Sequence, residues 1–198
     1  MHLGTIIALA LTLAAGQDLT EVRRMFDAGR YRDVVGAAEE ATAEADKASR
    51  LQYLAAQSYA KLDDADAARR TYQRLADGNN AWAPLGRSAV QLMDKQLDEA
   101  LESANQAVHL GSSLPEAHYQ RGLVLMTRKD YGAAAAAFTK ATELDSTFAT
   151  AYYYAGLAYY RERRVDLMTR NFETFVRLAP DSPERPEVQS ILRTVRGR

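Results

Sequence analysis

The chain resembles itself when it is shifted by 34 residues. Gly122 and Gly156 are one such step apart, and so are Phe138 and Phe172. The same shift aligns Ala100 with Ala134, Ala107 with Ala141 and Tyr119 with Tyr153, and it places Leu110, Leu144 and Leu178 in one column. A repeat this short is a single supersecondary unit that cannot bury its apolar face alone, so neighbouring units must stack on one another. The period therefore predicts a solenoid.

The repeated residues resemble the pattern of the tetratricopeptide repeat family. The last unit carries this pattern as Tyr152, Ala155, Gly156, Tyr159, Met168, Phe172, Phe175 and Pro180. The unit before it carries His118, Gly122, Leu125, Tyr131, Ala134, Phe138 and Ala141. The resemblance implies a helix, a turn and a second helix in each unit, and hence an all-α fold, an α-solenoid. Small residues let the two helices approach, and the aromatic residues fill the space between units.

Extension of this register to the whole chain predicts five tetratricopeptide units and a capping helix. The units span residues 17–48, 49–80, 81–114, 115–148 and 149–182, and residues 183–198 follow them. In this last stretch Val188, Ile191, Leu192 and Val195 have the spacing of one apolar helix stripe. Because the end of a repeat array would otherwise expose an apolar face, we expect a helix from Pro186 to Val195 to cover the fifth unit.

The first seventeen residues contain no Lys, Arg, Asp or Glu. From Leu3 to Ala15 they are largely Ala, Leu and Ile, a run too short for a membrane span, which needs about 20 apolar residues. Small residues at Ala14 and Gly16 fit a signal-peptidase site, so residues 1–16 are predicted to be a signal peptide. The protein would then be exported to a periplasm; the alternative is a chain anchored in a membrane by residues 1–17.

The composition argues against nucleic-acid binding and against most catalytic chemistry. A formal net charge of -1 supplies no long-range attraction for phosphate. The chain has no cysteine, and none of its three histidines has a second histidine three or four residues away. Its sequence contains no phosphate loop, zinc-binding helix motif or nucleophile elbow. We therefore predict a protein that is not an enzyme, with no catalytic residue, no metal and no cofactor.

The resemblance also implies a partner-binding surface, because in this family the first helices line a concave groove. The columns that contact ligands in the family hold chiefly apolar and aromatic side chains here. The predicted partner-binding residues are Tyr53, Gln57, Trp82, Leu85, Tyr119, Leu123, Met126, Tyr153, Leu157 and Tyr160. Tyrosine offers a flat face and a polar tip with few rotatable bonds, which favours it where affinity concentrates.

Some of these aromatic residues have a competing interpretation. Tyr119 and Tyr153 could simply pack on adjacent helices. Pro84 cannot lie in a helix interior, so it predicts the first turn of a shortened helix in the third unit. Trp82 would lie at the lip of that helix, where it either binds a partner or packs on the neighbouring unit.

Two charged clusters fall at predicted turns between helices. The three aspartates within residues 63–66 lack the central glycine and terminal glutamate of a calcium loop, so we assign them to the amino end of the following helix. Arg161, Arg163 and Arg164 give the far end of the array a basic edge, with a solvated turn as the alternative.

The sequence thus favours a non-catalytic scaffold or adaptor that binds a peptide or helix of a partner protein in the groove, in the cell envelope. Some relatives grip a C-terminal carboxylate through Lys, Asn and Arg on successive first helices. The corresponding fifth and ninth columns hold no Lys or Asn here, which argues against that mode. The alternative is a structural subunit that self-associates, or docks on a membrane complex, through its ends or convex face.

Overall fold

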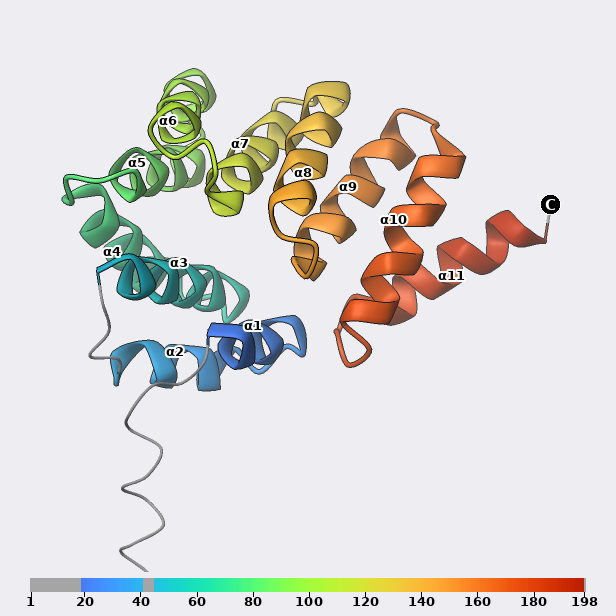
Figure 1. Cartoon of the computed structure of the whole chain (residues 1–198), viewed down its shortest axis with the longest axis horizontal. Coiled ribbons are helices and arrows are strands. Elements are labelled where there is room, and N and C mark those ends of the chain that lie inside the picture. Colours follow the sequence, from blue (N-terminus) through green and yellow to red (C-terminus); the bar gives the residue numbers. More distant parts are fainter. Residues whose placement is uncertain (1–18, 41–44, 198) are drawn as a thin grey trace, which may run out of the picture.

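The computed structural model describes residues 19–40 and 45–197, and within these ranges it contains eleven helices and no strand. The helices are α1 (Leu19–Asp27), α2 (Tyr31–Glu39), α3 (Ala45–Lys61), α4 (Ala65–Ala76), α5 (Trp82–Met93), α6 (Leu97–Leu110), α7 (Pro115–Thr127), α8 (Tyr131–Leu144), α9 (Ala149–Arg161), α10 (Val165–Leu178) and α11 (Arg185–Arg196). Successive helices form pairs along an arc (Figure 1). The predicted all-α solenoid of helix pairs with a final helix is confirmed. The predicted signal peptide, residues 1–16, lies outside the described residues.

The helix boundaries show how the pairs relate to the repeat register. Helices α7 and α8 both lie within residues 115–148. Helix α3 begins at Ala45 and therefore crosses the position between residues 48 and 49 at which we placed the start of the second unit. Pro84 is the third residue of α5, so it occupies the first turn, where a proline costs the helix no hydrogen bond.

A residue with left-handed backbone makes the turn inside each helix pair. Gly29, Asp63, Lys95, Lys129 and Arg163 have φ values between 57° and 75°, and each precedes the second helix by two residues. Gly29 is doubly constrained, because a Cβ at this position would also lie 3.2 Å from Cδ of Pro183.

Glycine and phenylalanine bring the helices of the later pairs together. Phe138 of α8 and Phe172 of α10 are completely buried. A Cβ at Gly122 would lie 2.5 Å from Cε1 of Phe138, and Gly156 is covered by Phe172 in the same way. Since no larger side chain fits beneath either ring, these pairs explain the first two coincidences of the 34-residue repeat.

Helix α11 ends the array by packing on α10. It buries Val188 and Leu192 in a cluster with Met168, Phe172 and Phe175, and it partly buries Ile191 and Val195. The apolar stripe predicted for the capping helix is therefore the face that covers the fifth pair, as an array end requires.

Candidate functional site

The solenoid curves so strongly that α1 approaches α9 and the loop after α10 (Figure 1). Side chains of α1 and α3 bridge to α7, to α9 and to the loops after α8 and α10, along a junction that we call the seam. The bridging pairs are Arg23 with Glu116 and Asp145, Arg50 with Glu116, Tyr53 with Gln120, Asp27 with Thr150, and Lys61 with Glu184. The inner side of the array is therefore occupied largely by the chain itself.

Glu116 lies at the centre of the seam and its side chain is only 1% exposed. Its Oε1 accepts a hydrogen bond from Nη2 of Arg23 at 2.8 Å and lies 3.2 Å from Nη1 of Arg50. Arg23 also donates to Asp145 at 3.1 Å, and its guanidinium lies 4.3 Å from the centroid of the Phe148 ring. Because a buried charge is tolerated only with its partners, these four groups hold one another in place.

A chain of hydrogen bonds continues the seam toward α5 and α6. Tyr53 Oη donates to Gln120 Oε1 at 2.9 Å, and Gln120 Nε2 donates to Ser88 Oγ at 3.3 Å. Ser88 Oγ in turn donates to the carbonyl oxygen of Ala100 at 2.9 Å. Burial raises the pKa of Tyr53 well above its usual range, so the phenol remains a proton donor in this chain.

The burial of the inner helices corrects half of the predicted groove. Tyr53, Trp82, Leu85 and Tyr119 are at most 2% exposed, and Gln57 is 9% exposed. Neighbouring helices cover their surfaces: Tyr53 packs on Tyr72 and Trp82, and Tyr119 packs on Phe138, Phe148 and Tyr154. Trp82 also donates from Nε1 to Asp46 at 2.9 Å. These five side chains are buried within the chain itself, which favours the packing interpretation of Tyr119 and Trp82 over the binding one.

The other five predicted residues keep some accessible surface. Leu123 and Met126 are partly buried against the central apolar cluster, and Tyr153 and Leu157 are partly buried against the α10 and α11 cluster. Tyr160, near the end of α9, is 54% exposed. Binding of a partner by these residues stays a prediction.

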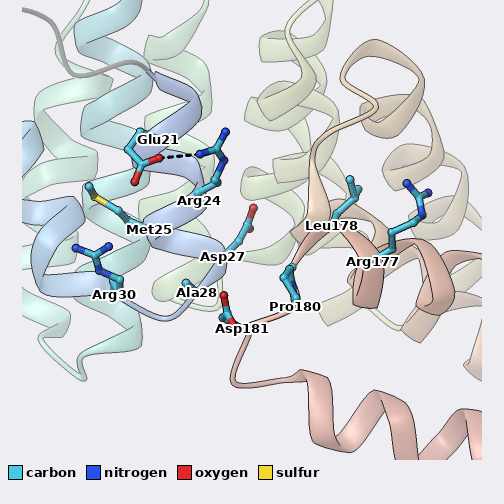
Figure 2. Close-up of a pocket in the computed structure, with 11 residues that line it drawn as sticks. Glu21, Arg24, Met25, Asp27, Ala28, Arg30, Arg177, Leu178, Pro180 and Asp181 are labelled. Carbon is cyan, nitrogen blue, oxygen red and sulfur yellow. Dashed lines mark hydrogen bonds and ion pairs between the residues drawn. The ribbon is translucent and has the colours of Figure 1, made fainter.

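A cleft of about 590 Å³ opens where the two ends of the array approach each other. One wall is α1 with the turn that follows it, and the other is the end of α10 with the loop after it (Figure 2). The lining residues are Glu21, Arg24, Met25, Asp27, Ala28 and Arg30 on one side and Arg177, Leu178, Ala179, Pro180 and Asp181 on the other. This volume falls within the range of about 300 to 1,000 Å³ that is usual for ligand sites.

The cleft is lined by charged side chains at its rim and by apolar side chains, which supply the larger share of its surface. Arg24 pairs with Glu21 at 3.0 Å on the rim, as Figure 2 shows, and Arg30 pairs with Asp33 at 2.6 Å. Arg177 is exposed on the opposite wall. Met25, Ala28, Leu178, Ala179 and Pro180 supply the apolar surface. Such a lining can accept apolar side chains on its floor and polar backbone at its edge.

A second cleft of about 390 Å³ lies against the first and shares Arg24, Asp27 and Leu178 with it. Its remaining lining includes Arg23, Arg50 and Asp145, which are members of the seam. The two clefts are therefore adjacent, and charged side chains of the seam line the second one.

Asp27 connects the clefts to the seam. Its carboxylate accepts a hydrogen bond from Oγ1 of Thr150 at 2.9 Å. Burial raises the pKa of Asp27 from 3.8 to about 6, because the hydrogen bond from Thr150 and the charge of Arg23 offset only part of the lost hydration. Glu184 and Asp145 add repulsion in the same direction.

The sequence contained a signal for the α1 side of the clefts and none for the side formed by residues 177–181. Arg23 and Asp27 occupy inward-facing positions of the first helix, and two charged residues on an otherwise apolar inner face indicate a polar contact. The repeat pattern includes Leu178 and Pro180, but nothing in it indicated that residues 177–181 line a cleft, which they do because the array curves back on itself.

In residues 19–40 and 45–197, no group of three or more His, Cys, Asp or Glu side chains is placed to hold a metal ion. His118 is 8% exposed, and its Nε2 lies 3.0 Å from the carbonyl oxygen of Ser112, which agrees with a packing role. Among the described helices, none combines the length and hydropathy that a membrane crossing requires.

The fold and the repeat define the class of protein, an α-solenoid of helix pairs. A family model described as tetratricopeptide repeat matches residues 115–148. These residues are thus a tetratricopeptide repeat, and the resemblance predicted from the sequence is confirmed. A search of curated proteins found no match.

Solved structures of tetratricopeptide proteins share the fold. The structure of YrrB, described as a TPR protein with an unusual peptide-binding site, has 19% identity and a TM-score of 0.54, with 85% of this chain and 88% of that chain covered. The first TPR of Spaghetti (RPAP3), bound to the HSP90 peptide SRMEEVD, has 17% identity and a TM-score of 0.56, with 61% and 94% covered. The structure of MamA has 18% identity and a TM-score of 0.50, with 82% and 95% covered. At these identities the likeness concerns the fold.

Proposed function

We propose that this protein is a non-catalytic interaction scaffold that binds a segment of a partner protein. Two of the structurally similar proteins support this class, since one is described as having a peptide-binding site and the other holds a peptide. The side chains of the seam also suit a structural role more than a catalytic one: its arginines are paired with carboxylates, and the buried Tyr53 and Tyr119 remain protonated because burial raises their pKa.

The observation that carries the proposal is the cleft of about 590 Å³ between α1 and the end of α10. Half of the groove residues predicted from the sequence are buried, whereas this cleft is open and is formed by two separate parts of the chain. Its floor of Met25, Leu178 and Pro180 can bury an apolar anchor of an extended segment. Most rim charges have partners already, so the site favours a segment with an apolar anchor and polar flanks over a highly charged one.

The proposal also places the protein in the cell envelope after export. The uncharged apolar start of the chain supports this location, and retention of residues 1–17 as an anchor is the alternative. Fractionation of the source cells with N-terminal sequencing of the purified protein tests it. A chain beginning at Gln17 in the periplasmic fraction agrees with export, and an intact N-terminus in the cytosolic fraction contradicts it.

Site-specific photo-crosslinking tests the cleft. A photoreactive phenylalanine derivative replaces Met25 in one variant and Leu178 in another, and the matched control carries it at Ala136, which is exposed on α8. After irradiation of source-cell extracts, both cleft variants are expected to form an adduct with the same protein, and the control is expected to form none.

The other outcomes are equally informative. Adducts of equal yield from Ala136 would show that contact is nonspecific, and the absence of adducts from both cleft positions would reject the cleft. A variant with the same group at Leu157 distinguishes the cleft from the predicted groove. A partner captured at Leu157 and not at the cleft would show that the accessible groove residues form the binding surface.

A further inference from the structure

The turns inside the helix pairs use one backbone conformation with different charges. The residue of positive φ is Asp63 in the second pair, Lys95 in the third, Lys129 in the fourth and Arg163 in the fifth. The charge of the side chain at this position therefore changes sign along the array. Since these residues share one backbone conformation, that conformation does not explain why their charges differ.

The fifth pair presents the most basic of these turns, residues 160–165, which we call the basic turn. Arg161, Arg163 and Arg164 are all exposed, with Glu162 as the acidic residue among them. Tyr160 and Val165 flank the arginines and are 54% and 48% exposed. Arginine and tyrosine are the side chains that most often concentrate affinity at protein interfaces.

The capping of the second helices differs from pair to pair. Asp64 and Asp130 cap α4 and α8 by accepting hydrogen bonds from the backbone of Ala67 and Ala133. At the equivalent positions Arg30, Gln96 and Arg164 make no capping hydrogen bond to α2, α6 and α10. A cation at a helix amino end and a missing cap each cost roughly 0.5 to 1 kcal/mol. Helix α10 therefore begins with a positive charge and without a capping bond.

The second pair presents the complementary turn, residues 62–66, which we call the acidic turn. It contains three aspartates and no basic residue, and Leu62 is 38% exposed beside them. In the described part of the chain four large apolar side chains are exposed, and three of them, Leu62, Tyr160 and Val165, lie in these two turns. Each turn therefore combines a charge of one sign with an exposed apolar side chain.

The two turns of one molecule are too far apart to pair with each other. The acidic turn follows Lys61, which bonds to Glu184 at 2.7 Å in the small pocket that also contains Thr150, near the start of α9. The basic turn is at the other end of α9, a helix of 13 residues and therefore about 20 Å long. Only a second molecule can bring an acidic turn onto the basic turn.

We propose that two copies of this chain associate head to tail, with the basic turn of one copy on the acidic turn of the next. The contact pairs arginines with aspartates around an apolar centre of Tyr160, Val165 and Leu62. Because the two surfaces differ, the contact is heterologous and can continue into rings or short chains. This inference does not depend on the cleft between α1 and α10.

A charge swap at the positive-φ position tests the proposal. The variants are Arg163→Asp and Asp63→Arg, and the backbone accepts both because the chain already places each residue type in that conformation. Lys129→Asp is the matched control, with the same geometry and charge change in a turn outside the contact. Sedimentation velocity at low salt and over a range of concentrations measures the mass relative to the 21.9 kDa chain.

The wild type and the control are expected to associate with rising concentration, and 0.5 M salt is expected to weaken that association, because roughly this ionic strength screens exposed charges within a few ångströms. For each single variant the association should weaken by a factor of about ten or more. An equimolar mixture of the two variants should recover the association, because the unchanged acidic turn of one variant meets the unchanged basic turn of the other. Far-UV circular dichroism of each variant shows whether the fold is retained.

Three outcomes would overturn the proposal: a wild type that stays monomeric, variants that associate as the wild type does, or a mixture that does not recover. Binding of the wild type to phosphatidylglycerol vesicles that Arg163→Asp abolishes, without self-association, would also overturn it and assign the basic turn to a membrane surface. Association lost equally in Lys129→Asp would contradict the assignment to these two turns.

Discussion

Replacement of Glu116 is the sharpest test of the closed seam. In Glu116→Gln the side chain keeps its volume and one oxygen acceptor, but Arg23 and Arg50 lose the buried charge that they share. The side chains of these arginines are 11% and 22% exposed, so water can replace the lost partner only in part. Loss of one member of a buried ion pair costs about 3 to 5 kcal/mol, and the remaining pairs of Arg23 with Asp145 and of Arg50 with Asp46 place the expected loss near the lower end, about 3 kcal/mol.

A double-mutant cycle separates the ion pair from the packing around it. Arg23→Met and Glu116→Met each remove one charge and retain an apolar side chain of useful length. The double variant leaves neither member of the closest pair unpartnered, so its cost should be smaller than the sum of the single costs by at least about 1 kcal/mol. An additive result would mean that Arg23 and Glu116 do not interact in solution.

Urea unfolding provides the measurement. Trp82 is the single tryptophan of the chain, is 2% exposed and lies beside Arg50, whose guanidinium is 5.8 Å from the indole centroid. Its fluorescence therefore reports the region of the seam, while circular dichroism reports all helices. Coincident transitions justify a two-state free energy, which repeat arrays do not always permit. A change below about 0.5 kcal/mol in Glu116→Gln, the level of an exposed pair, would refute a buried, closed seam.

The remaining predictions concern single sites. Because the folded-state pKa of Asp27 is about 6 and its ordinary value is 3.8, stability should fall as the pH rises from about 4 to about 6; Asp27→Asn should remove this slope in urea titrations and, allowing for partial exposure, add about 1 to 2 kcal/mol at pH 7. Arg164→Asp restores a capping residue to α10 and should raise the free energy of unfolding by about 1 kcal/mol while it weakens self-association; an unchanged thermal midpoint would contradict the cap. Gly122→Ala forces a Cβ against Phe138 and should cost about 1 to 3 kcal/mol by urea unfolding. The control Gly36→Ala meets no atom within 4 Å and should be neutral or stabilising, so equal losses in both variants would reject the overpacking explanation.

The fold could be predicted because its information is local and repeated. Gly122 with Phe138 and Gly156 with Phe172 are contacts inside one helix pair, so the same residue types recur at the same spacing in each. The capping stripe of α11 is likewise a pattern within one helix. Such short-range constraints appear directly in the sequence as a period.

The candidate site could not be predicted in the same way. Tyr119 has the residue type and the column of a groove contact, yet Phe138, Phe148 and Tyr154 surround it. Whether a residue on a first helix faces solvent depends on the angle between neighbouring pairs, and no single column encodes that angle. Small rotations at each interface accumulate along an array, so their sum sets the curvature.

The sequence by itself determined the helix pairs, their order, the small and aromatic residues that join them, and the charges of the two turns. Only the tertiary structure decided that the array closes, that Arg23 of the first helix meets Glu116 of the seventh, and that the accessible cleft lies between α1 and residues 177–181. The physical reason is distance along the chain. Contacts within a pair are set by neighbours a few residues away, whereas a contact between the ends depends on every interface between them.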